Sequence, residues 1–165
     1  MKQRTLILLK SDAIQRSLIG RILQRFEDAG LKVVASKFLW VDENLADKHY
    51  YDLGERRGEQ VKKRMVKFLT KTSPVLAFVL EGIEAVEVVR KLVGGTEPKT
   101  ALPGTIRGDF AHLSIEYSDK KDRCLPNLIH ASGNVKEAEK EIALWFKPEE
   151  IHDYRLSHEE HVSLA

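Results

Sequence analysis

Residues 127–134 of the chain read Asn-Leu-Ile-His-Ala-Ser-Gly-Asn. The apolar pair Leu128-Ile129 leads straight into His130, and small residues separate this histidine from a helix start. Asn134, followed three residues later by Glu137, is typical of a capping box ahead of an apolar helical face. The pattern therefore predicts His130 between the end of a buried strand and the positive end of a helix.

Two interpretations of His130 remain open on these residues alone. An unperturbed imidazole is largely neutral near pH 7, so one ring nitrogen offers a lone pair beside a helix end that attracts anions. That combination indicates phosphoryl transfer through a phosphohistidine. The alternative is a structural histidine that hydrogen bonds satisfy at a strand end.

Length and composition favour one globular domain over residues 1–165. A chain of 165 residues with 42% hydrophobic content can bury a core without a disulfide or a structural metal. The lone Cys124 excludes an internal disulfide and favours a reducing compartment. No apolar run is long enough for a signal peptide or a membrane span, so a cytoplasmic location is expected. A net charge of +2 argues against charge-driven binding of nucleic acid.

The hydrophobic pattern predicts the order of strands and helices. Residues 5–9 form a continuous apolar run, typical of a central strand that is buried on both faces. Further strands are expected at 32–40, 75–80 and 110–117, helices at 14–26, 42–51, 60–69, 83–93 and 135–146, and loops at 52–58, 96–109 and 118–126. Without its extra helices this is a βαββαβ pattern, which predicts an antiparallel four-stranded sheet with helices on one face. A parallel doubly wound sheet is the competing arrangement.

Several polar residues fall beside apolar ones, and each has two interpretations. Arg90 shares a helix face with apolar neighbours. It is either a snorkelling arginine at the edge of the core or a residue whose guanidinium group binds a phosphate. Arg107, in a long loop, either meets a phosphate or pairs with Asp109. Glu141 lies at the edge of an apolar stripe, where its partner is a histidine N–H or an outer lysine. Lys10 ends a buried strand at the edge of a site or at the solvent.

Three other features carry less functional weight. Cys124 has no histidine near it in the sequence, which argues against a catalytic thiol. His158 and His161 lack the His-Glu-x-x-His spacing of a zinc site and are typical of a solvated, polar C-terminal tail. The basic run at 62–67 favours a solvated helix face over a partner site.

The stretch 127–132 closely resembles the Asn-x-x-His-x-Ser signature of the nucleoside diphosphate kinases. Further matches to that family, in the same order, are Lys10 with Ser11-Asp12, His49-Tyr50, Glu81-Gly82, Gly95-Thr96-Glu97-Pro98, the eight residues Pro-Gly-Thr-Ile-Arg-Gly-Asp-Phe at 103–110, and Ala-Glu-Lys-Glu-Ile at 138–142. The resemblance spans roughly residues 4–155. It implies a ferredoxin-like domain that moves the γ-phosphate of a nucleoside triphosphate to a nucleoside diphosphate. The family's reaction is ping-pong, passes through a phosphohistidine and uses Mg²⁺ on the nucleotide phosphates.

The resemblance also implies roles for individual residues. His130 would be the nucleophile, with Ser132 and Glu141 as its supporting residues. The nucleotide-binding residues that it implies are Lys10, Tyr50, Arg90, Thr96, Arg107 and Asn127. No protein ligand for Mg²⁺ is expected. ATP and other nucleoside di- and triphosphates would be the partners, with no membrane or specific nucleic acid, and the family's usual assembly implies a homohexamer or tetramer built from dimers.

The sequence departs from the family pattern in a few places. Ser11 and Ala13 stand where proline and glycine are usual, and Gly133 replaces a common aspartate. The stretch at 52–63 is lengthened and has no phenylalanine where the family commonly stacks the nucleotide base. Counting back from Phe68 places Val61 near that position. The segment 111–126 is about ten residues longer than in typical members. Two roles are open for it: a hairpin over the site, or part of a subunit contact.

Two other functions remain open beside the kinase. The first is a non-catalytic nucleotide-binding or scaffold protein with the same fold, which the altered base-stacking region favours. The joint presence of Lys10, Arg107, Asn127 and His130 argues against it. The second is an RNA-binding ferredoxin-like module, which needs exposed aromatic side chains on its strands and a basic face. The near-neutral net charge disfavours that function.

Overall fold

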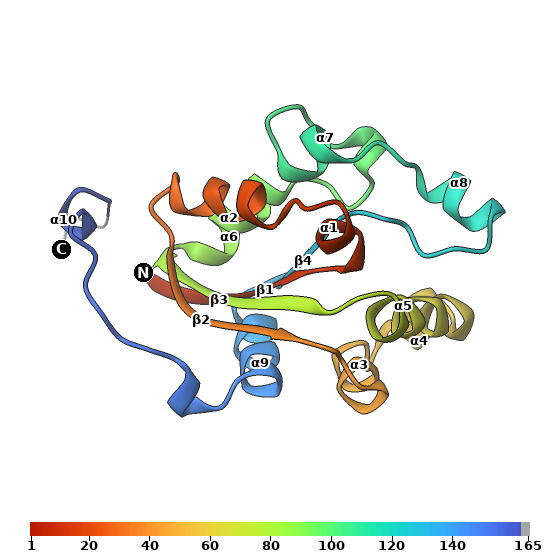
Figure 1. The fold of residues 1–165 in the computed structure, drawn as a ribbon, viewed down its shortest axis with the longest axis horizontal. Coiled ribbons are helices and arrows are strands. Elements are labelled where there is room, and N and C mark those ends of the chain that lie inside the picture. Colours follow the sequence, from red (N-terminus) through yellow and green to blue (C-terminus); the bar gives the residue numbers. More distant parts are fainter. Residues whose placement is uncertain (163–165) are drawn as a thin grey trace.

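The sheet of the computed structural model, which describes residues 1–162, has four strands in the order β2-β3-β1-β4 (Figure 1). The strands are β1 (Lys2–Leu9), β2 (Lys32–Leu39), β3 (Val75–Ile83) and β4 (Ile129–Ala131). Each neighbouring pair is antiparallel. This order and direction confirm the predicted ferredoxin-like sheet and exclude the parallel doubly wound alternative.

Helices follow every strand and supply most of the connections. They are α1 (Ser11–Gln15), α2 (Ile19–Glu27), α3 (Glu43–His49), α4 (Leu53–Arg57), α5 (Glu59–Lys71), α6 (Ala85–Val93), α7 (Ile106–Phe110), α8 (Ile115–Lys120), α9 (Val135–Trp145) and α10 (Glu159–Val162), with short 3₁₀ turns η1 (Pro98–Thr100) and η2 (Pro148–Glu150). In the described part of the chain, no helix combines the length and apolar character needed to cross a membrane.

Strand β1 is buried on both faces, as its unbroken apolar run predicts. Ile7 and Leu9 belong to a core cluster that α2 and α6 complete, whereas Leu6 and Leu8 belong to a second cluster with α3, α5 and α9. Figure 1 shows these two sets of helices on opposite sides of the sheet. The expectation of helices on one face only was therefore wrong, because helix α9 and the segment 43–71 cover the other face.

Two predictions about the helices need correction. The single helix expected at 14–26 is divided between α1 and α2, because Ser17 adopts a left-handed φ of 55°. The N–H of Leu18 bonds to the carbonyl of Ala13, and that of Ser17 to Ile14, which is the Schellman pattern of a helix end. The loop expected at 52–58 contains α4.

The fourth strand lies elsewhere than the sequence predicted. Residues 110–117 join the end of α7 to the start of α8, where the Ser114 hydroxyl caps the helix by accepting the N–H of Tyr117. The fourth strand is instead the short β4, which pairs with the edge of β1 that β3 leaves free. Its register sets His130 opposite Leu8. His130 is therefore part of the sheet itself and does not merely follow a strand.

The C-terminal segment after α9 returns along the edge strand β2. The N–H of His152 bonds to the Val34 carbonyl at 2.8 Å, and the Tyr154 hydroxyl donates to the Val33 carbonyl at 2.6 Å. Lys32 then bonds to Glu159 at 2.9 Å. The polar tail expected from the sequence thus begins as an arm that is attached to β2.

Candidate active site

The backbone before His130 is fixed by residues from the turn that follows β1. Leu128 adopts a left-handed φ of 68°, which is unusual for a branched residue. The Asp12 carboxylate accepts the Leu128 N–H at 2.7 Å, and the Lys10 N–H donates to the Leu128 carbonyl at 2.8 Å. These bonds define the direction in which the chain enters β4 and presents the His130 ring.

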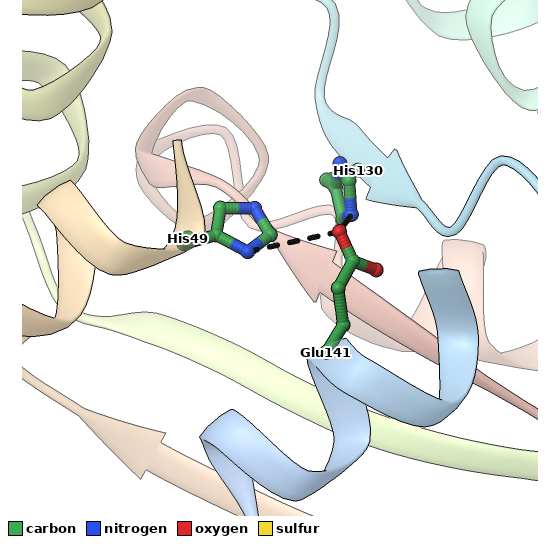
Figure 2. A group of neighbouring side chains, drawn as sticks. All are labelled: His49, His130 and Glu141. Carbon is green, nitrogen blue, oxygen red and sulfur yellow. Dashed lines mark hydrogen bonds and ion pairs between the residues drawn. The ribbon is translucent and has the colours of Figure 1, made fainter. Parts of the chain in front are cut away.

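The two nitrogens of the His130 ring lie in different surroundings. Nε2 is 2.8 Å from Glu141 Oε1, on α9. The Ser132 hydroxyl donates to the other carboxylate oxygen, Oε2, at 2.6 Å and accepts the Leu6 N–H at 3.2 Å. In Figure 2 the Nδ1 end of the His130 ring points away from Glu141. The carboxylate thus engages one nitrogen and leaves Nδ1 available as a nucleophile.

A second histidine lies against this pair. His49, the last residue of α3, meets His130 edge to face with 4.5 Å between ring centroids, and its Nδ1 is 3.8 Å from Glu141 Oε1 (Figure 2). Its Nδ1 also accepts the indole N–H of Trp145 at 3.3 Å. Burial, together with the nearby His130 and Lys10, lowers the pKa of His49 well below its usual value, so this ring is neutral at pH 7.

Two buried cations bond to the residues that precede His130. Lys10 is 3% exposed, and its ammonium donates to the side-chain oxygen of Asn127. Arg107 donates to three backbone carbonyls, those of Asn127 at 3.2 Å, Gly94 at 3.0 Å and Ile129 at 2.7 Å. Burial and the nearby Arg90 lower the pKa of Arg107 to about 10, and burial lowers that of Lys10. Arg107 therefore remains charged at neutral pH.

A cavity of about 1190 Å³ connects these groups. Of the nine side chains that the sequence assigned to the site, eight line it: Lys10, Tyr50, Arg90, Thr96, Arg107, Asn127, His130 and Glu141. The ninth, Ser132, is fully buried behind Glu141. Burial raises the pKa of Tyr50 far above its usual range, so its hydroxyl keeps its proton and can donate.

The structure decides between the alternatives for the paired residues. Asp109 forms its ion pair with Arg25 at 2.8 Å, so the pairing of Asp109 with Arg107 was wrong. Glu141 is buried and pairs with the histidine, whereas Arg90 is exposed at the rim. Lys10 lies inside the site.

The far end of the cavity is formed by the lengthened segments. Val61 lines it, together with Leu53, Met65, Cys124 and Leu125. Arg64 of α5 also lines the cavity and pairs with Asp119 of α8 at 3.0 Å, so the basic run at 62–67 is only partly a solvated face. Burial raises the pKa of Cys124, which keeps it a neutral thiol and agrees with the argument against a catalytic role.

The helix start behind His130 differs from the predicted capping box. The Asn134 side chain accepts the Glu137 N–H at 2.9 Å, as expected. Glu137, however, bonds to the N–H of Gly133 at 2.5 Å and not to that of the cap residue. A Cβ at Gly133 would lie 2.3 Å from the Glu137 carboxylate, so the absence of a side chain there makes this bond possible.

Among the described residues, one group has the donors and spacing for a metal ion. It consists of His49, His130 and Glu141, whose ligand atoms lie within 4.8 Å of one another. The lone pair of His49 Nδ1 is already engaged by Trp145, and Glu141 holds both His130 and Ser132. These bonds favour a hydrogen-bonded cluster over a metal centre.

Sequence reasoning gave no role to three residues that shape this site. His49 appeared only as half of the His49-Tyr50 match, and Trp145 only within the helix expected at 135–146. Asp12 appeared only in the match of Lys10 with Ser11-Asp12, yet its carboxylate accepts the Leu128 N–H. The spacing of Glu141 and Trp145, one helical turn apart, was the available signal that the two side chains share a face.

Comparison with known proteins agrees with the site geometry. The family model described as nucleoside diphosphate kinase matches residues 3–151. A nucleoside diphosphate kinase of Borreliella burgdorferi is 52% identical over 155 residues, covering 93% of this chain and 92% of the relative. One from Pyrococcus horikoshii is 51% identical over 152 residues, covering 92% and 90%.

Solved structures give the same result. A transition-state mimic of nucleoside-diphosphate kinase from Borrelia burgdorferi, with bound vanadate and ADP, superimposes with a TM-score of 0.94 at 50% identity and covers 97% of this chain and 96% of its own. An enzyme from Pyrobaculum aerophilum gives a TM-score of 0.85 at 36% identity, over 93% and 100%. The chain therefore belongs to the nucleoside diphosphate kinase family and is a nucleotide-binding phosphotransferase.

Proposed function

We propose that His130 accepts the phosphoryl group and that Nδ1 is the attacking atom. The observation that carries this proposal is the 2.8 Å contact between Nε2 and Glu141, which leaves the Nδ1 lone pair for the substrate. The Nδ1 lone pair attacks the γ-phosphorus of the triphosphate, the bond from that phosphorus to the β-phosphate oxygen breaks, and the diphosphate leaves. A second diphosphate then attacks the phosphohistidine with a terminal oxygen and releases the Nδ1 lone pair.

Glu141 and Ser132 support the nucleophile in this proposal. Phosphorylation of Nδ1 makes the ring positively charged, with a proton on Nε2, and the carboxylate at 2.8 Å stabilises that charge. The Ser132 hydroxyl, by donating to Oε2, fixes the orientation of the carboxylate. The pair thus acts on the ring from the side opposite to the substrate.

The six remaining residues are proposed to bind the nucleotide. Lys10, Arg90 and Arg107 offset the charge on the phosphate oxygens, since positive groups around a transferring phosphoryl lower its barrier. Tyr50, Thr96 and Asn127 offer hydroxyl and amide groups that line the same cavity. The base would enter the apolar far end, near Val61, where few groups can distinguish one base from another.

Membership of this family brings a general requirement for a divalent metal, and we propose that the ion is Mg²⁺ carried by the nucleotide phosphates. Mg²⁺ prefers oxygen ligands and often binds through substrate phosphates. Lys10, Arg90 and Arg107 line the phosphate end of the cavity, and Glu141 is already engaged. These residues fit an ion that arrives with its substrate. When bound, the ion would neutralise phosphate charge.

We also propose that residues 1–165 form a single cytoplasmic domain that assembles into a homohexamer or tetramer. Phe38 and Trp40, at the end of the edge strand β2, are 59% and 63% exposed, which supports a subunit contact there. The segment 111–126 carries α8, whose residues line the cavity beside α5. This position favours the interpretation that the segment 111–126 covers the nucleotide site over the interpretation that it forms a subunit contact.

Initial-rate measurements of phosphate exchange test the proposed function. With ATP as donor and several nucleoside diphosphates as acceptors, the double-reciprocal plots should be parallel, as a phosphoenzyme intermediate requires. His130→Gln should abolish exchange. His112→Gln is the matched control, because His112 is exposed and lies outside the cavity lining. Intersecting lines, or exchange by the His130 variant at the wild-type rate, would contradict the proposal.

A further inference from the structure

The hydrogen bond between Trp145 and His49 determines which nitrogen of His49 carries its proton. An indole N–H can only donate, so His49 Nδ1 must accept it at 3.3 Å with a lone pair. Since the ring is neutral, the proton is then on Nε2, which is buried and has no hydrogen-bond partner among the described residues. The other tautomer would set two N–H donors against each other.

The chosen tautomer matters because Nδ1 of His49 faces the carboxylate that supports His130. Glu141 Oε1 is 2.8 Å from His130 Nε2 and 3.8 Å from His49 Nδ1 (Figure 2). A proton on His49 Nδ1 would point a donor at Oε1 from 3.8 Å, and a small shift of the ring would form a second hydrogen bond that weakens the one to His130. With a lone pair there, His49 offers Oε1 no proton.

The groups around His49 also act against its protonation. Lys10 and His130 disfavour a second positive charge beside them, and the side chain of His49 is only 1% exposed. Glu141, from α9, faces His49 at 3.8 Å and would favour the charged ring, whereas Tyr50 packs edge-on at 4.8 Å and keeps its proton. The hydrogen bond from Trp145 stabilises the neutral form and so opposes the effect of Glu141.

We propose that Trp145 and His49 are a positioning pair: the indole N–H holds His49 in the tautomer that offers Glu141 no proton, which reserves this carboxylate for His130. The proposal rests on the role of His130 as the nucleophile and adds the means by which its supporting carboxylate is kept free. Trp145 itself is buried and does not line the cavity, so it acts only through its neighbours.

Trp145→Phe tests the pair, because phenylalanine keeps an aromatic ring but donates no hydrogen bond. In this variant His49 should move its proton to Nδ1, which nitrogen-15 NMR of the histidine rings detects. Protonation of His49 should also become easier. Because the neutral Nδ1–H tautomer is present at pH 8 as well, kcat should fall roughly fivefold at pH 8, the size expected for weakening one hydrogen bond, with KM nearly unchanged. The loss should be larger at pH 6, where His49 is also protonated.

Two further variants separate positioning from simple packing. Trp40→Phe makes the same substitution at the proposed subunit contact, away from His49, and should leave the His49 tautomer unchanged. In His49→Gln, the amide N–H of the glutamine can donate to Glu141 at every pH, so kcat should be below the wild-type value at both pH 6 and pH 8. Adding Trp145→Phe to His49→Gln should have no further pH-dependent effect. Melting temperatures identify any variant that is not folded.

An unchanged His49 tautomer in Trp145→Phe would overturn the proposal, as would a wild-type kcat at both pH 6 and pH 8. Failure of the function proposed for His130 gives a different result, namely wild-type enzyme that takes no label on His130 from γ-labelled ATP. The two ideas can therefore fail separately.

Discussion

Arg90 and Arg107 both line the nucleotide cavity, but the protein holds them in opposite ways. Arg107 is buried and donates to three backbone carbonyls, one at the end of α6 and two in the stretch just before His130. Arg90 is exposed, and only its position on α6 directs it toward the cavity. Both supply positive charge, yet only Arg107 also holds the fold together.

Alanine substitutions should separate these two roles. Arg107→Ala should lower the free energy of unfolding by about 2–4 kcal/mol, since hydrogen bonds from a charged group are worth more than neutral ones and their carbonyls become unpaired. Arg90→Ala should change it by less than about 0.5 kcal/mol and still reduce kcat roughly 10- to 100-fold. Urea titration and the exchange assay measure both quantities. Equal destabilisation by the two substitutions would contradict the distinction.

Individual residues show where sequence reasoning reached the site and where it stopped. The Asn-x-x-His-x-Ser signature located His130, and the helical stripe located Glu141 at a partly buried edge. The sequence could not exclude an Arg107–Asp109 pair, because the actual partner of Asp109, Arg25, is 84 residues away. His49 was not assigned a role, because its bond to Trp145 spans 96 residues.

Gly94 and Gly20 illustrate how the elements constrain the backbone. Gly94 ends α6 with a φ of 84°, and a Cβ there would lie 2.5 Å from the Thr105 hydroxyl oxygen. Its carbonyl also accepts a bond from Arg107. Gly20 lies in α2 with open space around it. One glycine is therefore required by its surroundings, and the other is not.

The same substitution at both glycines should have opposite signs. Gly94→Ala should lower the free energy of unfolding by about 2 kcal/mol or more, because of the positive φ and the close contact. Gly20→Ala should raise it by about 0.5–1 kcal/mol through better helix propensity. Thermal unfolding of the two variants gives the comparison. A stable Gly94→Ala protein would show that this helix end can rearrange.

At the scale of elements, hydrophobic periodicity predicted best the segments whose faces are clearly buried. The runs in β1 and α9 report directly which side chains enter the core. The break in the first helix was missed because its left-handed residue is Ser17, where a glycine would have been the usual signal. The sequence indicated a strand end before His130 but left β4 out of the strand order, because three residues are too short for a periodic pattern. The region 110–117, which alternates by chance, was predicted as the fourth strand in its place.

Glu81 connects distant parts of the whole molecule. It is buried on β3 and pairs with Lys2 and Arg4 of β1 and with Lys32 of β2, which in turn bonds to Glu159 in the C-terminal arm. Burial alone would raise the pKa of this carboxyl, but the bonds from the three cations lower it below its ordinary value. The charged carboxylate thus stabilises the assembled sheet.

This arrangement predicts a loss of stability in acid. A carboxyl whose pKa is lower in the folded state contributes stability above its unfolded pKa and loses that contribution as the pH falls through the folded value. The free energy of unfolding should therefore decrease from about pH 4.5 downward. Glu81→Gln should be less stable at pH 7 and should have a flatter profile in this range. Parallel profiles for the two proteins would show that Glu81 does not titrate with unfolding.

Labelling of the enzyme with γ-labelled ATP is the most direct test of the central claim, that His130 carries the phosphoryl group. The wild-type protein should take up one phosphate that is labile in acid and stable in base, and peptide mapping should place it on His130. His130→Gln should remain unlabelled, while His112→Gln should label as the wild type does. Stable labelling of the His130 variant, or a phosphate on any other residue of the wild type, would contradict the mechanism.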